Sequence, residues 1–245
     1  MIRFLRSFLC CISFAIFGIG GLIVGLIVFP MILLLFRGDR QRRYLAGTVR
    51  VTWRGFISML CALRLISVRC PDSDKLRTLH GHIIIANHPS LLDVVILVSF
   101  IPNSICIVKD RLLHNFFIGR IIRRIYLSNG LSPAEFLSRG TEYLNAGYNI
   151  IIFPEGTRTV PGRAIHFHRG FAYLQIASRH PITPIKITNT PRILGKDQPW
   201  HDIGRHTSVY TLTLLPVMGY DPSLVGDRTS AILITRKAKT ALFSA

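Results

Sequence analysis

The sequence contains few acidic residues: 12 Asp and Glu stand against 30 Lys and Arg, which gives a formal net charge of +18. This imbalance excludes a strong affinity for cationic partners. It favours anionic ones, such as phospholipid headgroups, phosphorylated substrates, acidic carrier proteins or nucleic acid. A chain of 245 residues suffices for one domain with a sizeable core and a peripheral element, but not for two large domains. We therefore expect a single core.

Cysteine is also scarce, and no two cysteines have the C-x-x-C spacing of zinc or redox sites. The five cysteines are Cys10, Cys11, Cys61, Cys70 and Cys106. Their odd number favours a reduced domain that faces the cytosol over a disulfide framework. The histidine pairs, His80 with His82 and His166 with His168, have no third ligand signature, so we expect no metal site.

Charge is missing altogether from the 30 residues between Ser7 and Phe36, although arginines flank this run on both sides. A secretory signal would have an apolar region of only about 7 to 15 residues and a small-residue cleavage site. The run is therefore expected to lie in lipid. One straight helix would be roughly 45 Å long, against a hydrocarbon core of about 30 Å, so the helix must tilt, protrude or break.

Possible break points are Gly18, Gly20, Gly21, Gly25 and Pro30. A break near Gly20 and Gly21 would leave two halves that are each too short to cross a bilayer. The halves would form a hairpin in one leaflet with both arginine flanks on the same side, and we favour this over a tilted single span. The next segment, around Arg50 and Arg54, predicts a helix at the headgroup interface or packed on the domain. Residues 1–64 are thus expected to form the membrane-anchoring region and residues 65–245 an α/β domain.

Beyond Pro71, short β-branched runs alternate with helix-like stretches. The predicted strands are residues 82–87, 104–109, 149–153, 182–187 and 208–215, and the predicted helices are residues 91–100, 112–124, 133–146 and 170–178. Runs such as Ile83 to Ile85 are apolar throughout, as a sheet buried on both faces requires. The sequence therefore predicts an α/β fold with a mostly parallel buried sheet flanked by helices and an N-terminal membrane-embedded helical segment. Reactive groups are expected where strands end and helices begin.

The string Asn87-His88-Pro89-Ser90-Leu91-Leu92-Asp93 places a carboxylate five positions after a histidine that ends an apolar strand. On an ideal helix such residues lie about 140° apart, so they meet only if His88 stays outside the helix. Pro89 is suited to the first helical position and predicts that geometry. A histidine whose other ring nitrogen meets a carboxylate can remove a hydroxyl proton near neutral pH. The alternative is a helix cap, with Asp93 favouring the positive helix N-terminus.

A second apolar strand runs into the polar turn Phe153-Pro154-Glu155-Gly156-Thr157-Arg158-Thr159. Gly156 lets backbone N–H groups approach an anion, and Arg158 offers a planar fork that matches phosphate oxygens. Glu155 is suited to accept a hydrogen bond from an acceptor hydroxyl or to hold Arg158. An ordinary Glu–Arg surface pair is the alternative.

The strings NHPSLLD and FPEGTRT resemble the blocks N-H-x-S-x-x-D and F-P-E-G-T-R-S of the glycerolipid acyltransferase superfamily, typified by 1-acylglycerol-3-phosphate O-acyltransferases. Lys109, which opens a block containing Gly119, and the stretch Pro181 to Ile185 extend the resemblance in the same order over residues 83–187. The resemblance implies an O-acyltransferase that moves a fatty acyl group onto a hydroxyl of a lysophospholipid or related lipid. The donor would be acyl-CoA or an acyl carrier protein, a co-substrate rather than a cofactor.

The same resemblance assigns roles to individual residues. His88 would be the general base, oriented by Asp93. The acceptor phosphate would be bound by Lys109, Glu155, Gly156 and Arg158. The protein would be bound to a membrane, with its catalytic domain on the cytoplasmic face, of the inner membrane if the source is bacterial.

The sequence departs from the family after the second block. Lysophosphatidate enzymes carry a Phe-Ile-Asp-Arg-like string where this chain has Arg124-Ile125-Tyr126-Leu127-Ser128-Asn129-Gly130. Because a phosphomonoester needs several cationic donors to offset its desolvation, we expect an acceptor other than lysophosphatidate, such as another lysolipid or a specialised hydroxylated lipid.

Two other functions compete with acyl transfer. A membrane-tethered nucleic-acid-binding protein would suit the charge, but it leaves both strings unexplained, so no nucleic acid is expected as a partner. A silent lipid-binding scaffold is the second alternative, and intact His88 and Asp93 argue against it.

Overall fold

The computed structural model describes residues 2–108, 110, 126–223 and 228–243. At its centre, strands pair into a seven-stranded sheet in the order β1-β7-β6-β2-β5-β3-β4. In that order the strands are Ile66–Arg69, Ser208–Leu214, Ile182–Thr190, Ile83–Ala86, Asn149–Ile152, Ser104–Val108 and Leu127–Ser128. All neighbours are parallel except β6 and β7. The expected α/β fold with a mostly parallel sheet is confirmed.

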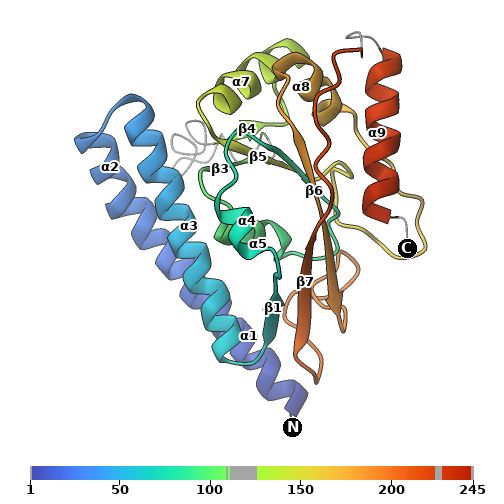
Figure 1. Ribbon diagram of the computed structural model, residues 1–245. Helices are drawn as coiled ribbons and strands as arrows, with labels where there is room; N and C mark the ends of the chain where they lie inside the picture. The colour runs from blue at the N-terminus through green and yellow to red at the C-terminus, as the bar shows by residue number, and fades with distance from the viewer. Residues whose placement is uncertain (1, 109, 111–125, 224–227, 244–245) are drawn as a thin grey trace.

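Helices cover both faces of the sheet (Figure 1). One face carries α3 (Gly38–Ala62), α4 (Ser73–Arg77) and α5 (Asp93–Phe100), and the other carries α7 (Pro133–Asn145), α8 (Gly170–Ser178) and α9 (Arg228–Phe243). Side chains of a strand point alternately to the two faces. Ile84 therefore packs in the core with α3 and α5, whereas Ile83 and Ile85 pack in the core with α7 and α8. This double burial explains why β2 is apolar at every position.

Several elements differ from the sequence prediction. The strands β1 and β4 and the helices α4 and α9 were not predicted, and β6 extends three residues beyond the predicted strand, to Thr190. The helix predicted at residues 112–124 lies outside the described residues. The remaining predicted elements are present with bounds shifted by a few residues at most.

The N-terminal apolar run forms one continuous helix composed of α1 (Ile2–Ile23), the π-helical turn η1 (Val24–Val28) and α2 (Phe29–Leu35). The predicted break at Gly20 and Gly21 is wrong, because both glycines lie inside α1. The helix is distorted instead just before Pro30, another of the possible break points, because the proline ring cannot accommodate a regular preceding turn. The helix is long and apolar enough to cross a membrane by length and composition.

The chain reverses after α2, and α3 runs back alongside α1 (Figure 1). The buried side chain of Gln41 stabilises the reversal by donating to the carbonyls of Leu33, at 3.2 Å, and Phe36, at 2.5 Å. These are among the carbonyls that a helix end leaves without partners. A helical hairpin is thus present, but its second arm is α3 rather than the second half of the apolar run.

The inner side of α1 packs on the α/β domain. Phe17 stacks on Phe56 of α3, with ring centroids 4.3 Å apart. The guanidinium of Arg6 donates to the carbonyls of Arg64, Leu65 and His206 at 3.0, 3.2 and 2.9 Å. Apolar side chains on the other side of the helix, such as Ile19 at 61% and Leu34 at 80%, are exposed. The hairpin is therefore fixed to the domain along one side and leaves an apolar surface on the other.

Candidate active site

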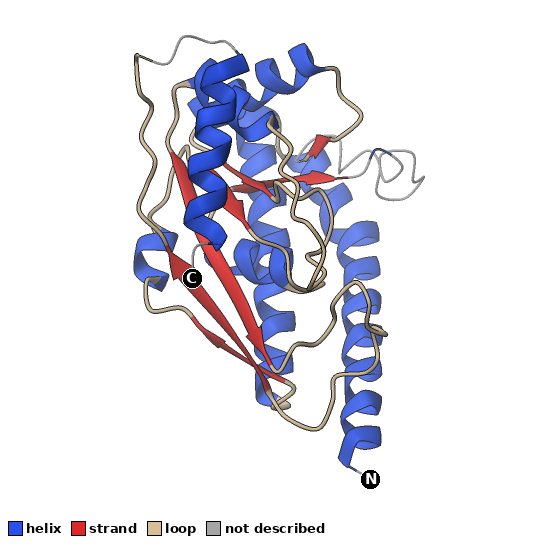
Figure 2. Cartoon of the chain, turned by 90° about the vertical axis from the view of Figure 1, so that its right-hand side faces the viewer, coloured by secondary structure: helices blue, strands red, loops and turns tan. Residues whose placement is uncertain are grey.

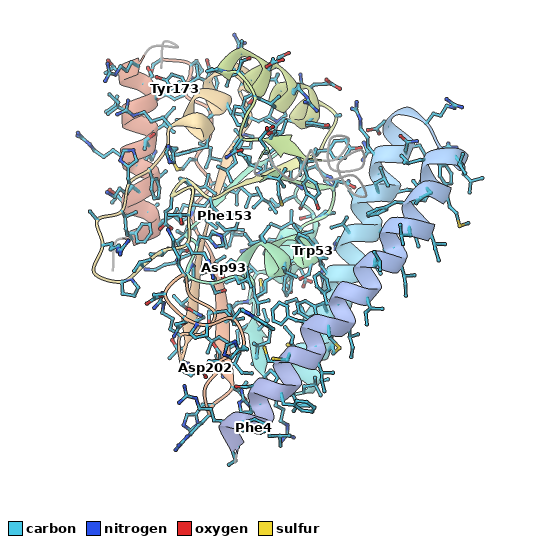
Figure 3. The ribbon with its side chains drawn as sticks, turned by 180° about the vertical axis from the view of Figure 1, so that it is seen from behind. Phe4, Trp53, Asp93, Phe153, Tyr173 and Asp202 are labelled. Carbon is cyan, nitrogen blue, oxygen red and sulfur yellow. The ribbon has the colours of Figure 1, made fainter. Side chains whose placement is uncertain are left out.

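The two polar strings meet because the strands before them are neighbours. Strands β2 and β5 are parallel and in register, with Ile84 opposite Ile151. His88 follows β2 and Glu155 follows β5, and the carboxyl ends of parallel strands share one edge of a sheet. The edge lies in the middle of the molecule, where Asp93 and Phe153 are close together, far from Phe4 at the N-terminal end of α1 (Figure 3).

The expected contact between His88 and Asp93 is present. The Nδ1 atom of His88 lies 2.8 Å from Oδ2 of Asp93, which is fully buried. The same carboxylate accepts hydrogen bonds from the backbone N–H of Ser90 at 2.7 Å and from its hydroxyl at 2.6 Å. A carboxylate on Nδ1 assigns the proton to that nitrogen and leaves Nε2 as a proton acceptor.

The turn between His88 and the helix differs from the prediction in one respect. Pro89 is not the first helical residue, because α5 begins at Asp93. Ser90 explains why α5 begins later than predicted. Its hydroxyl accepts a hydrogen bond from the N–H of Leu92 at 3.1 Å and donates one to Asp93. Such local bonds offer the backbone an alternative to the helix. Asp93 consequently lies in the first turn with its carboxylate facing back to His88, as expected.

Glu155 and Thr159 hold the main chain of His88. The N–H of His88 donates to Oε1 of Glu155 at 3.0 Å and lies 3.3 Å from Oγ1 of Thr159. The hydroxyl of Thr159 donates to the same Oε1 at 2.8 Å, and the N–H of Thr159 donates to the carbonyl of His88 at 2.7 Å. Burial raises the pKa of Glu155, while the bonds from Thr159 and His88 favour its ionised form. Glu155 is thus engaged with the histidine segment rather than with Arg158.

Two of the other residues assigned to the acceptor phosphate, Arg158 and Gly156, have contacts of their own. Arg158 uses Nη1 to donate to the carbonyls of Leu194 and Gly195, each at 3.0 Å. Gly156 adopts a φ of +63°, and a Cβ there would lie 3.0 Å from a ring carbon of His168. Lys109 lies outside the described residues. Their roles in phosphate binding stay predictions.

A cavity of about 680 Å³ opens beside the pair. It lies over the ends of β3 and β5, between α7 and α8. Most of its lining is apolar and includes Ile107, Phe136, Leu137, Phe153, Phe171 and Tyr173. The ring of Phe153 also stacks on His88, with centroids 4.2 Å apart. One aromatic side chain therefore separates the imidazole from an apolar space.

Comparisons with known proteins point to one family. A family model described as Acyltransferase matches residues 67–188. A 1-acyl-sn-glycerol-3-phosphate acyltransferase of Cocos nucifera is 27% identical over 176 residues, covering 69% of this chain and 56% of that protein. The beta form from Homo sapiens is 25% identical over 158 residues, covering 60% and 55%. The chain spans about half the length of the curated relatives it matches.

A solved structure has the same fold. The crystal structure of the 1-acyl-sn-glycerophosphate (LPA) acyltransferase PlsC from Thermotoga maritima matches with a TM-score of 0.71 and 17% identity, covering 100% of this chain and 98% of that one. The chain belongs to the glycerolipid acyltransferase superfamily. The segment that the family model matches contains both strings and the strands that carry them.

Two features of the site could not be predicted from the sequence. Thr159 bonds with His88 across two strands, and the carbonyl of Leu194 accepts from both Arg158 and the N–H of Leu91 at 3.0 Å. The only signal for Thr159 was its place at the end of FPEGTRT. Leu194 carried no signal, because its contribution is a backbone oxygen.

Replacing Asp93 by Asn should lower kcat on the order of 10²- to 10⁴-fold with little change in KM. An amide can still accept from Ser90, but it presents the wrong partner to Nδ1 of His88 and disturbs the tautomer. Steady-state kinetics alongside thermal melting separates this effect from misfolding. A change confined to KM would instead assign Asp93 a purely structural role at the start of α5.

Replacing Thr159 by Val should reduce kcat roughly tenfold, since a hydrogen bond to a charged group contributes about 1.5–3 kcal/mol. Thr159→Ser keeps the hydroxyl and should stay within about twofold of the parent. The kinetics of the two variants, measured with the same substrates, test whether the hydroxyl positions His88. A larger loss in Thr159→Ser than in Thr159→Val would show that the methyl group, and hence packing, is what matters.

Proposed function

We propose that this chain transfers a fatty acyl group from a thioester donor to a hydroxyl of a lysophospholipid at the His88–Asp93 pair. One observation carries the proposal: a buried carboxylate occupies Nδ1 of His88, beside an apolar cavity and within a fold of acyltransferases. Membership of the family supports the reaction class.

In the proposed reaction, Nε2 of His88 takes the proton of the acceptor hydroxyl as its oxygen attacks the thioester carbonyl carbon. The tetrahedral intermediate then expels the thiolate, which receives that proton back from the imidazolium. The ester and a free thiol are the products. Asp93 stabilises the imidazolium during transfer without being protonated itself. Glu155 and Thr159 act by holding the histidine in place.

The cavity supports a lipid substrate over a small polar one. Its aromatic and aliphatic lining suits an alkyl chain, whose burial stabilises binding by about 0.8 kcal/mol per methylene. Phe153 borders both the cavity and His88. We infer that an alkyl chain in the cavity brings its reactive end to the imidazole.

The acceptor is proposed to be lysophosphatidate, because the matched relatives are named 1-acyl-sn-glycerol-3-phosphate acyltransferases. A second candidate is a lipid without that phosphomonoester. The absence of the Asp-Arg pair from the stretch 126–130 favours it. The proposed donor is acyl-CoA or an acyl carrier protein.

Purified protein should form the acylated lipid from a thioester and lysophosphatidate, and His88→Ala should lower the rate at least 10²- to 10⁴-fold while folding is retained. The assay compares lysophosphatidate with other lysolipids and hydroxylated lipids under both donors. Near-normal turnover by His88→Ala would contradict the mechanism. A higher kcat/KM for another acceptor would identify the second candidate as the physiological one.

We further propose that the hairpin lies in one leaflet, with the α/β domain on the cytoplasmic face, of the inner membrane if the source is bacterial. A helix that crossed the bilayer would have to pull its inner side away from the domain. The bonds of Arg6 and the stacking of Phe17 on Phe56 oppose this. The exposed apolar side of α1 and α2 supports embedding along its length.

Replacing Ile19 and Leu26, which are exposed on this side, by Glu should release the protein from neutral vesicles, because each charge in the hydrocarbon costs about 2.5–3.5 kcal/mol. Leu233→Glu, at an exposed position of α9, is the matched control and should remain bound. Flotation in high salt measures the release. Protease protection of an N-terminal tag on the side opposite to a C-terminal tag would indicate a span instead.

A further inference from the structure

A cluster of cations lies on the side of the molecule that carries α9. It consists of Arg236, Lys237 and Lys239 of α9 and Arg163 and Arg169 of the loop between β5 and α8, and it is called the basic face below. Residues 157–169 and 228–243 contain no Asp or Glu. Within the described part of the chain, none of the five cations forms a salt bridge with a carboxylate, and Lys237 alone is close enough to Asp221 to lower the pKa of that carboxyl. The basic face therefore carries an excess of positive charge, which Asp221 offsets only at Lys237.

The basic face lies away from the proposed membrane surface. The hairpin of α1 and α3 covers one face of the sheet, and α9 packs with the core on the other (Figure 1). Figure 2 looks directly onto α9 in front of the sheet. A leaflet in contact with the exposed side of α1 is thus separated from α9 by the thickness of the domain, which exceeds a Debye length of about 8 Å. These cations are available to a soluble partner rather than to that leaflet.

The loop that joins the basic face to the active site is well defined by contacts. It begins at Thr159, which bonds with His88, and ends near His168, which lies against Gly156. Halfway along it, the ammonium of Lys239 donates to the carbonyl of Ile165 at 2.7 Å. A partner that binds the basic face would therefore sit beside the segment that holds the catalytic histidine.

We propose that the basic face docks an acidic carrier protein that delivers the acyl thioester. The proposal rests on the acyl-transfer function proposed above. An extended patch of one sign matches a protein surface of the opposite sign, and such complementarity raises association rates by about 10- to 10³-fold at low salt. Acyl-CoA, the other possible donor, is a small anion that needs only a few cations close to the site for binding. It therefore does not account for an extended basic surface.

The test is a charge reversal at three positions of the basic face, Arg163→Glu, Arg236→Glu and Lys237→Glu, all of them exposed. Lys239 is left unchanged because it bonds with the loop. The matched control reverses three exposed cations elsewhere, Arg69, Lys196 and Arg205, and so changes the net charge equally. The kcat/KM of each is measured in neutral detergent with carrier-protein and CoA thioesters of one acyl chain.

The basic-face variant should lose roughly 10- to 100-fold in kcat/KM with the carrier thioester. Its kcat/KM with the CoA thioester should stay within about twofold of the parent's, as should both values of the control variant. The parent's carrier rate should fall more steeply with salt than its CoA rate. Equal losses with both donors, or none with the carrier, would overturn the proposal.

Two further outcomes separate this proposal from the function on which it rests. Turnover of the parent with the CoA thioester but not with the carrier thioester would overturn the docking proposal and leave acyl transfer intact. Turnover with neither donor would count against acyl transfer, and docking would then be judged by binding of the acylated carrier to immobilised parent and variant. Binding that salt and the three substitutions do not weaken would overturn it.

Discussion

The buried carboxylate of Asp93 is the group on which the arrangement of the site depends. An ionised carboxylate out of water is costly unless it is paired and hydrogen-bonded. Asp93 meets that requirement through His88 and both polar groups of Ser90. The hydrogen bonds that stabilise this carboxylate thus place the start of α5 at Asp93 and also orient the imidazole of His88. The contacts that stabilise the fold locally are also those that would prepare Nε2 for the proposed proton transfer.

The histidine is fixed from a second direction by the strand next to its own. Asp93 constrains the ring, whereas Glu155 and Thr159 constrain the backbone of His88 through bonds that cross from β5. Because β2 and β5 are parallel and in register, the two polar strings arrive at one edge without a long loop. In the proposed function, a base held at both its ring and its main chain would lose little freedom when substrate binds.

The sequence allowed the central strands and the His88–Asp93 contact to be predicted, because both depend on local patterns. Continuous apolar runs identify strands buried on both faces, and the five-residue spacing needs only one turn to close. The two-residue strand β4 is too short to leave a pattern. Helix α9 was missed since several of its buried positions are small residues such as Ser230 and Ala238. The contact of Thr159 with His88 depends on strand pairing, which spacing along the chain does not encode.

The N-terminal helix shows how tertiary packing overrides local propensity. Two adjacent glycines inside an apolar run predicted a break, yet α1 continues through Gly20 and Gly21 because its inner side is held by the domain on both sides of them. The helix is instead distorted before Pro30, as a π-helical turn over Val24–Val28, because the proline ring excludes a regular preceding turn. Once the helix is held in this way, the molecule has an apolar side and, across the sheet, a cationic side. Under the proposals above, the apolar side faces the membrane and the cationic side faces the soluble thioester donor.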